Sequence, residues 1–111
     1  MIDELLHHRG TTLVRRQRLA PGEATPWHRD PHHRISIVLQ GESLAIEFRD
    51  GAPAEPQSLR PGQCDWEEPC DRMHRAVNTG SGDYEEVTIF LIAAPDADPQ
   101  PRCEEPEERC P

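Results

Sequence analysis

Hydrophobic and polar residues alternate with a period of two along most of the chain. In residues 34–40, Ile35, Ile37 and Leu39 share one face and leave Ser36 and Val38 on the other. The same alternation returns in residues 44–48, and glycine or proline follows most of the alternating runs. Because successive side chains of a β-strand point to opposite faces, this pattern predicts a protein built from strands.

The alternating runs predict a series of short strands. We expect them at residues 12–20, 34–40, 44–48, 58–59, 64–67, 73–77 and 84–92. Only residues 2–8 have helical character. Short strands joined by glycine turns are typical of a sandwich or jelly roll, so the predicted fold class is all-β.

The composition changes sharply near residue 93. Residues 94–111 hold six acidic residues, two arginines and five prolines, and they offer few side chains that could be buried. Such a segment gains too little from burial to offset the entropy lost on folding. We therefore expect one domain, residues 1–93, followed by an extended or disordered acidic tail, residues 94–111.

The charge and the apolar runs exclude several classes of partner. The chain of 111 residues has a formal net charge of −9, and an acidic surface repels phosphate backbones and anionic lipids. The longest apolar run, residues 87–94, is too short to span a membrane, and the first residues lack the apolar core of a secretory signal. We expect a cytoplasmic protein that binds neither nucleic acid nor membrane. The four cysteines form no Cys-x-x-Cys pair, which argues against a zinc knuckle or a redox motif.

Residues with metal-binding chemistry lie on two of the alternating segments. Strand parity places His28, Asp30 and Arg34 on one face of the first segment, and His74 shares a face with Asn78 in the second. If both faces turn inward, two imidazoles and a carboxylate meet in one pocket. This ligand set suits Fe(II) or Mn(II) and leaves coordination positions open for water or a substrate.

The same two segments carry a resemblance to the cupin superfamily. The first resembles the cupin motif G-x5-H-x-H-x3-E-x6-G and reads Gly22-x5-His28-x-Asp30-x3-Arg34-x6-Gly41. The second resembles the motif P-x-G-x2-H-x3-N and reads Pro69-x4-His74-x3-Asn78. The resemblance covers about residues 12–92. It implies a small single-domain cupin of the cupin-2-like kind, which is a jelly-roll barrel also called a double-stranded β-helix.

Three positions depart from the family motifs: Asp71 replaces the glycine of the second motif, and the other two are ligand positions of the first. The family's ligands are two histidines, a glutamate and a third histidine, whereas this chain has Asp30 at the second position and Arg34 at the third. A carboxylate can bind a metal, but a guanidinium stays protonated and has no lone pair to donate. The predicted metal ligands are therefore His28, Asp30 and His74, with Fe, Mn, Ni or Zn as the ion. A pocket that binds no metal is the alternative.

Arg34 has two opposed interpretations. It can direct its guanidinium at the carboxylate of a bound small acid and act as a substrate-binding residue. It can instead pair with Asp30 and take that carboxylate away from a metal. Trp27 is a second candidate for substrate binding, although packing of its ring against the barrel explains it as well. His32 and His33 either replace a missing ligand or are solvated.

The predicted pocket is compatible with three functions. The first is a mononuclear metal-dependent dioxygenase, isomerase or lyase that acts on a small organic acid. The second is a cupin that binds a small carboxylate in the barrel without chemistry. The third is an oxygenase of the 2-oxoglutarate type, which is disfavoured because no arginine stands about ten residues after His74. The sequence identifies no catalytic acid or base.

The apolar row Ile35, Ile37 and Leu39 faces away from the predicted pocket. An apolar row on the outside of a barrel requires a cover, either the N-terminal segment or a second subunit. We therefore expect a homodimer, which is also common among cupins.

Overall fold

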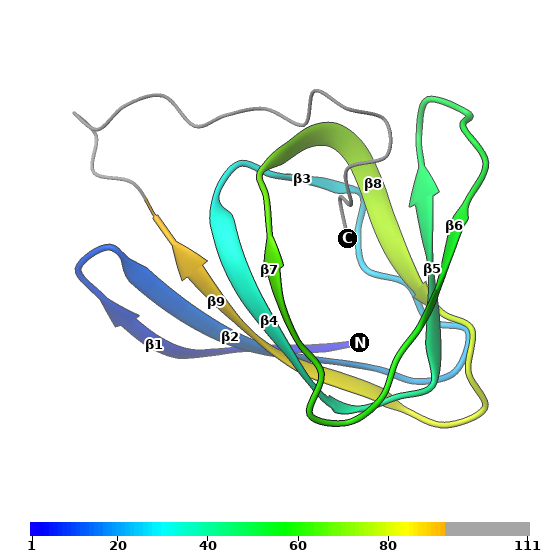
Figure 1. Cartoon of the computed structure of the whole chain (residues 1–111), viewed down its shortest axis with the longest axis horizontal. Helices are drawn as coiled ribbons and strands as arrows, with labels where there is room; N and C mark the ends of the chain where they lie inside the picture. The colour runs from blue at the N-terminus through cyan, green and yellow to red at the C-terminus, as the bar shows by residue number, and fades with distance from the viewer. Residues whose placement is uncertain (93–111) are drawn as a thin grey trace.

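The computed structural model describes residues 1–92, which form two antiparallel sheets that face each other around a common interior (Figure 1). The strands are β1 (Ile2–Arg9), β2 (Thr12–Leu19), β3 (His28–Asp30), β4 (His33–Gln40), β5 (Ser43–Phe48), β6 (Glu55–Ser58), β7 (Cys64–Glu67), β8 (Cys70–Asn78) and β9 (Tyr84–Leu91). One sheet has the order β1-β2-β9-β4-β7 and the other β3-β8-β5-β6. The predicted all-β jelly roll is confirmed. The expected tail, residues 94–111, lies outside the described residues.

Two of the predicted elements are wrong. Residues 2–8 form strand β1 rather than a helix, because they pair with β2 on both sides of a bulge at Leu6, through the tight turn at Gly10. Pairing with a neighbouring strand overrides the weak local preference of this segment. Strand β6 begins at Glu55, earlier than predicted, although Pro56 lies within it. It is an edge strand of its sheet, where a proline is tolerated. No helix in residues 1–92 has the length and apolar character needed to cross a membrane.

The apolar core consists of two clusters of buried side chains. Strand β5 alternates as predicted, and its buried side chains are Leu44, Ile46 and Phe48. Leu44 packs with Val38 and other buried side chains in one cluster, while Ile46 and Phe48 belong to a second. The turn between β4 and β5 requires Gly41, because a Cβ at this position would lie 2.8 Å from Cδ1 of Tyr84. The second cluster adjoins the polar residues of the interior, because the ring centres of Phe48 and His74 lie 6.3 Å apart.

Backbone hydrogen bonds fix the segment before β3 against β8. The Gly22 N–H donates to the Asn78 carbonyl at 2.8 Å, and the Asn78 N–H donates to the Glu23 carbonyl at 2.9 Å. Further along, the Thr25 N–H donates to the Ala76 carbonyl at 2.9 Å. These contacts join the two segments that resemble cupin motifs and set the position at which β3 begins.

The outward row of β4 is located as predicted, but it is not covered by the N-terminal strand. Ile35 and Ile37 are half-buried, and Leu39 is exposed at the end of β4. Strand β1 extends the edge of the same sheet and is separated from β4 by β2 and β9. The suggestion that the N-terminal segment covers this row is therefore wrong, and contact with a second subunit stays a prediction.

Candidate metal centre

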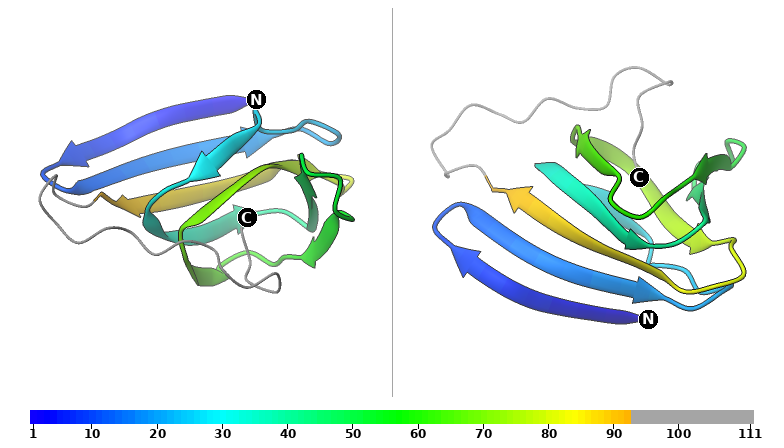
Figure 2. Two further views of the ribbon diagram at one scale, coloured as in Figure 1. Left: turned by 90° about the horizontal axis from the view of Figure 1, so that it is seen from above. Right: turned by 60° about the horizontal axis from the view of Figure 1, so that its bottom comes forward.

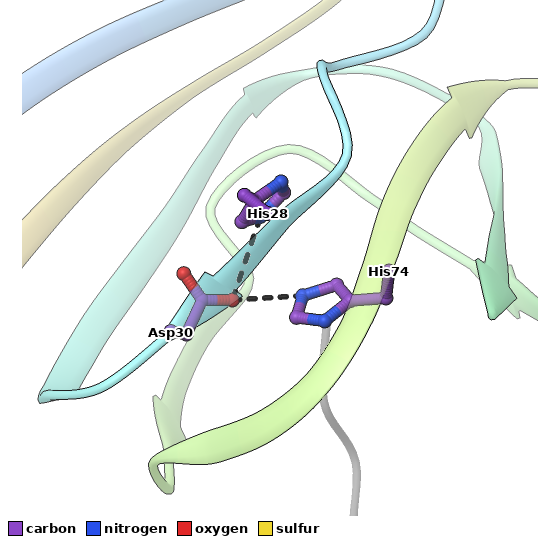
Figure 3. Close-up of side chains that lie close together, drawn as sticks. All are labelled: His28, Asp30 and His74. Carbon is purple, nitrogen blue, oxygen red and sulfur yellow. Dashed lines mark hydrogen bonds and ion pairs between the residues drawn. The ribbon is translucent and has the colours of Figure 1, made fainter. Parts of the chain in front are cut away.

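The three predicted ligands lie together inside the barrel. His28 and Asp30 are on the short strand β3, and His74 comes from the neighbouring strand β8, where it stands opposite His28 in register. One ligand atom from each residue lies within 4.8 Å of the other two. Figure 3 shows both imidazoles directed toward the same oxygen of Asp30. The structure therefore brings together residues that are far apart in the sequence, as the strand parity predicted.

The orientation of the two rings fits metal ligation. The Nδ1 atoms lie 2.7 Å from the Pro26 carbonyl oxygen for His28 and 2.8 Å from the Arg72 carbonyl oxygen for His74. Both Nε2 atoms face Oδ2 of Asp30, at 3.5 Å from His28 and 2.8 Å from His74. Metal-binding histidines commonly donate the other ring N–H to a carbonyl, which leaves the free nitrogen lone pair for the ion. Two imidazoles and one carboxylate are thus suitable for a divalent transition metal.

Arg34 lies beside the carboxylate that a metal would need. One guanidinium nitrogen lies 3.3 Å from Oδ2 of Asp30, and another donates to the carbonyl of Glu68 at 3.3 Å. The side chain is buried, so its charge is poorly screened by solvent. Of the two interpretations of Arg34, the structure contains the ion pair with Asp30.

Asp30 is held in its ionised form. Burial alone would raise the pKa of its carboxyl, but hydrogen bonds with His28 and His74 and the charge of Arg34 outweigh it and hold the pKa far below its ordinary value. Burial also lowers the pKa of His28, yet the hydrogen bond with Asp30 and its negative charge raise that pKa overall. The centre therefore presents a negative carboxylate to any cation near neutral pH.

Two of the candidate ligands, His28 and Asp30, line a cavity of about 320 Å³. Its walls include inward-facing residues of β2, β4 and β9, among them Gln17, Ser36 and Phe90. A second hollow lies along the loop of residues 58–65 and contacts none of the three candidate ligands. The first cavity has the size of a small-molecule site.

The charged residues of this cavity are mostly paired with one another. Besides Arg34, the cavity contains Arg15, whose guanidinium lies 3.1 Å from Oδ1 of Asp3. Two more carboxylates, Glu67 and Glu86, line the wall. Both pocket arginines therefore already contact aspartates, and the cavity has an excess of negative charge.

Hydroxyl groups surround the two glutamates. Ser36 donates to Oε2 of Glu67 at 3.3 Å, and Glu86 accepts hydrogen bonds from the hydroxyls of Tyr84 and Thr88. The sequence analysis did not identify these residues as part of the site. For Glu86 and Thr88, the pattern that could have found them is the recurrence of polar side chains at every second position of β9, a strand otherwise rich in apolar residues.

The remaining candidates lie outside this cavity. Trp27 precedes His28 by one residue and lies near Arg49 and Arg75, with the Arg75 guanidinium 4.5 Å from its ring centre. It does not line the cavity, so the structure offers no support for Trp27 as a substrate-binding residue. Trp66 is half exposed. The ring of His33 packs against Trp66, and neither His33 nor His32 joins the ligand cluster found in residues 1–92.

The fold and the cavity define a jelly-roll barrel with a candidate metal site in its interior. The family model described as Cupin domain matches residues 15–90, more than half of the chain. The protein therefore belongs to the cupin family. No curated protein sequence matches it.

Solved structures with the same fold have low sequence identity to this chain. A cupin domain from Bordetella pertussis is 21% identical, with a TM-score of 0.74 over 83% of this chain and 93% of that chain. A cupin superfamily protein from Desulfitobacterium hafniense is also 21% identical, with a TM-score of 0.61 over 83% of this chain and 77% of that chain. An oxalate oxidase in complex with the substrate analogue glycolate is 26% identical, with a TM-score of 0.58 over 77% of this chain but only 44% of that chain.

Proposed function

We propose that this protein is a metal-dependent cupin that binds one divalent transition metal through His28, Asp30 and His74 and takes a small organic acid into the adjoining cavity. The observation that carries the proposal is the convergence of the three ligand atoms within 4.8 Å, beside a cavity of about 320 Å³ that His28 and Asp30 line. The metal, Fe, Mn, Ni or Zn, would act as a Lewis acid or redox centre for a dioxygenase, isomerase or lyase.

The protein's own residues have separate tasks in this proposal. The Pro26 and Arg72 carbonyls orient the rings of His28 and His74, and the hydrogen bonds with these rings and the charge of Arg34 keep Asp30 ionised. The barrel wall limits access of water to the candidate centre, because Asp30 and His74 are buried and only His28 is partly open. The ligand would enter from the cavity side, where Ser36 and Thr88 present hydroxyl groups.

In this proposal, the metal supplies the positive charge that binds a small organic acid. The two pocket arginines contact Asp30 and Asp3, and two glutamates add to the negative charge of the wall. The oxalate oxidase with a similar fold was solved with glycolate, a small hydroxy acid, and this supports glycolate as a first probe. We propose that a carboxylate ligand binds beside the metal. Without the metal, it would compete poorly with Asp30 and Asp3 for the two arginines.

A metal-free cupin that only binds a small ligand is the second candidate. The contact of 3.3 Å between Arg34 and Asp30 favours it, because this ion pair neutralises the carboxylate without any metal. In that case the ligand's carboxylate would displace Asp30 from Arg34. The two candidates differ in whether the pocket charge is balanced by an ion or by a side chain.

Metal analysis separates the two candidates. We expect wild-type protein, reconstituted in turn with Fe, Mn, Ni and Zn and then desalted, to retain about one ion per chain with at least one of these metals. His74→Ala should lose most of this metal, since the ion would keep only two protein ligands. His33→Ala is the matched control, because it removes an imidazole from the outer face. Bound metal should also raise the melting temperature of the wild type but not of His74→Ala.

Wild-type protein that retains none of the four metals would refute the metal site. The binding-only candidate then predicts that glycolate raises the melting temperature of metal-free protein and that Arg34→Ala abolishes this rise.

A further inference from the structure

Strand β1 is the most exposed strand of the fold. All eight of its residues are exposed, and it forms the edge of the five-stranded sheet. Strand β2 pairs with one side of it, and no strand within residues 1–92 pairs with the other side. Figure 2 shows β1 as the outermost strand of the sheet, next to β2 and away from the second sheet. An unpaired edge of this length offers a row of backbone donors and acceptors to another strand.

Apolar side chains lie along this open edge. Ile2 is 48% exposed, Leu5 54% and Leu6 43%. Soluble proteins usually protect such an edge with charges, prolines or a cover, because an apolar edge strand pairs readily with other chains. Strand β1 has no proline; its charged residues lie on either side of the centre, which is a pair of leucines. The edge is therefore suited to pairing with another strand.

The register with β2 shows which side chains share a face. Gln17 and Arg15 of β2 line the cavity, so Asp3 and Leu5, which stand opposite them, lie on the inner face. Glu4 lies opposite Arg16 and therefore on the outer face. The register shifts between Leu5 and His7, where β1 has a bulge. Beyond the bulge the parity is reversed.

After this reversal the strand becomes symmetric about its midpoint between Leu5 and Leu6. His8 stands opposite Leu13 of β2 on the inner face, like Asp3. His7 and Arg9 lie on the outer face, as Glu4 and Ile2 do. Residues at equal distances from the midpoint therefore share a face. When a two-fold axis relates two antiparallel copies of one strand, it pairs residues at equal distances from the midpoint, and paired residues must lie on the same face.

The charges of β1 are complementary under the same symmetry. Paired about the midpoint, Asp3 lies opposite His8 of the second copy, and Glu4 lies opposite His7 of the second copy. Acidic residues thus occupy one half of the strand, and imidazoles followed by Arg9 occupy the other. Imidazole N–H groups can donate to carboxylates across such a pair. The reverse, parallel arrangement would place like residues side by side.

We propose that a second copy of this chain binds to this edge and that the two β1 strands pair antiparallel about a two-fold axis between Leu5 and Leu6. The five-stranded sheets of the two copies then form one continuous sheet. The leucines meet at its centre, and the charged residues set the register. This contact differs from the outer row of Ile35, Ile37 and Leu39, which has no such complementarity of charge.

The existing ion pairs of β1 are compatible with this contact. Asp3 lies 3.1 Å from Arg15, and Glu4 lies 2.7 Å from Arg16, both within one chain. A carboxylate has several lone pairs and can accept from a second donor. Because these side chains are solvent-exposed, the pairs contribute orientation more than affinity. Affinity comes from the backbone ladder and from the leucines that the contact would bury.

A charge-exchange experiment tests the proposal. The first variant, Asp3→Lys with Glu4→Lys, makes both halves of β1 basic. The second variant, His7→Glu with His8→Glu, makes both halves acidic. We expect dimeric wild type by light scattering at micromolar concentration and a dimer dissociation constant raised at least about tenfold in each variant. An equimolar mixture should restore a dimer that native mass spectrometry identifies as one copy of each. Circular dichroism checks that every variant is folded.

Two further variants keep the test decisive. Leu6→Lys places two lysines beside the two-fold axis and should dissociate the dimer even if a double variant fails to fold. Leu39→Glu alters the outer row and should leave the dimer intact. A monomeric wild type, folded charge variants that stay dimeric, or a mixture without the mixed dimer would each overturn the proposal. A dimer that only Leu39→Glu dissociates would place the contact on the outer row.

Discussion

Arg34 occupies the position of the glutamate in the cupin motif, and its effect is local and electrostatic. Its guanidinium lies 3.3 Å from the Asp30 oxygen that also faces both histidines. A fixed positive charge at this distance stabilises the ionised carboxylate and opposes the binding of a cation beside it. The same residue therefore prepares Asp30 as a ligand and competes with the metal for it.

Replacing Arg34 with the family residue should strengthen metal binding. We expect Arg34→Glu to lower the metal dissociation constant at least about tenfold, because the change removes a buried positive charge and supplies a fourth ligand. Without metal, the new carboxylate would lie near Asp30 and destabilise the fold. Isothermal titration with the metal that the wild type retains measures the affinity, and a thermal melt of the metal-free protein measures the stability.

Arg34→Gln separates the two effects of this substitution. It removes the charge without adding a carboxylate, so its affinity should lie between those of the wild type and Arg34→Glu. Equal affinity in all three proteins would mean that Arg34 does not control the site.

At the scale of elements, Asn78 joins the end of β8 to two other segments. Its side-chain amide is buried and donates to the carbonyls of Leu19 at 3.0 Å and Gly82 at 2.9 Å, while its oxygen accepts from the Gly80 N–H at 2.9 Å. One side chain thus satisfies backbone groups at the end of β2 and in the turn before β9. The second cupin-like motif ends at this residue.

Asn78→Ala should destabilise the fold without affecting the candidate ligands directly. Each buried backbone group left unpaired costs about 1–3 kcal/mol, and a loss of 1 kcal/mol lowers Tm by about 4–8 °C in a domain of this size. Thermal denaturation measures the change. Ser43→Ala is the control, because it removes only a solvent-exposed hydroxyl pair with Thr79 in the same region. An Asn78→Ala melt equal to that of Ser43→Ala would show that water replaces these hydrogen bonds.

At the scale of the whole molecule, charge governs which ligands the cavity can accept. The chain has a net charge of −9, and the cavity wall holds carboxylates in excess of arginines. A small anion therefore approaches a surface and a cavity that both repel it unless a metal is bound.

Glycolate should consequently bind only to the metal-loaded protein. We expect glycolate to raise the melting temperature of the protein that retains a metal and to leave the metal-free protein unchanged, since the ion supplies the only uncommitted positive charge in the proposed site. Ethylene glycol, which has the same size and no carboxylate, is the control ligand. Equal shifts with and without metal would favour the binding-only cupin.

The sequence by itself determined the class of fold and the two faces that bear the site. Alternation with a period of two located most of the strands, and the spacing of glycine, histidine and asparagine resembled the cupin motifs. Parity along β3 and β4 correctly placed His28, Asp30 and Arg34 on the inner side, because side-chain direction in a strand is fixed by local geometry. Parity also placed Ile35 on the outside.

Only the tertiary structure decided which groups meet across strands. The ion pair of Arg34 with Asp30 and the polar wall of Ser36, Glu67 and Glu86 depend on the register of strands that are distant in sequence. The strand character of residues 2–9 was likewise set by pairing with β2, since the local preference of this segment is weak. Local patterns fix the direction of a side chain. Its partners on other strands are fixed by non-local packing, and no repeating pattern in a single sequence shows which residues of distant strands will pair.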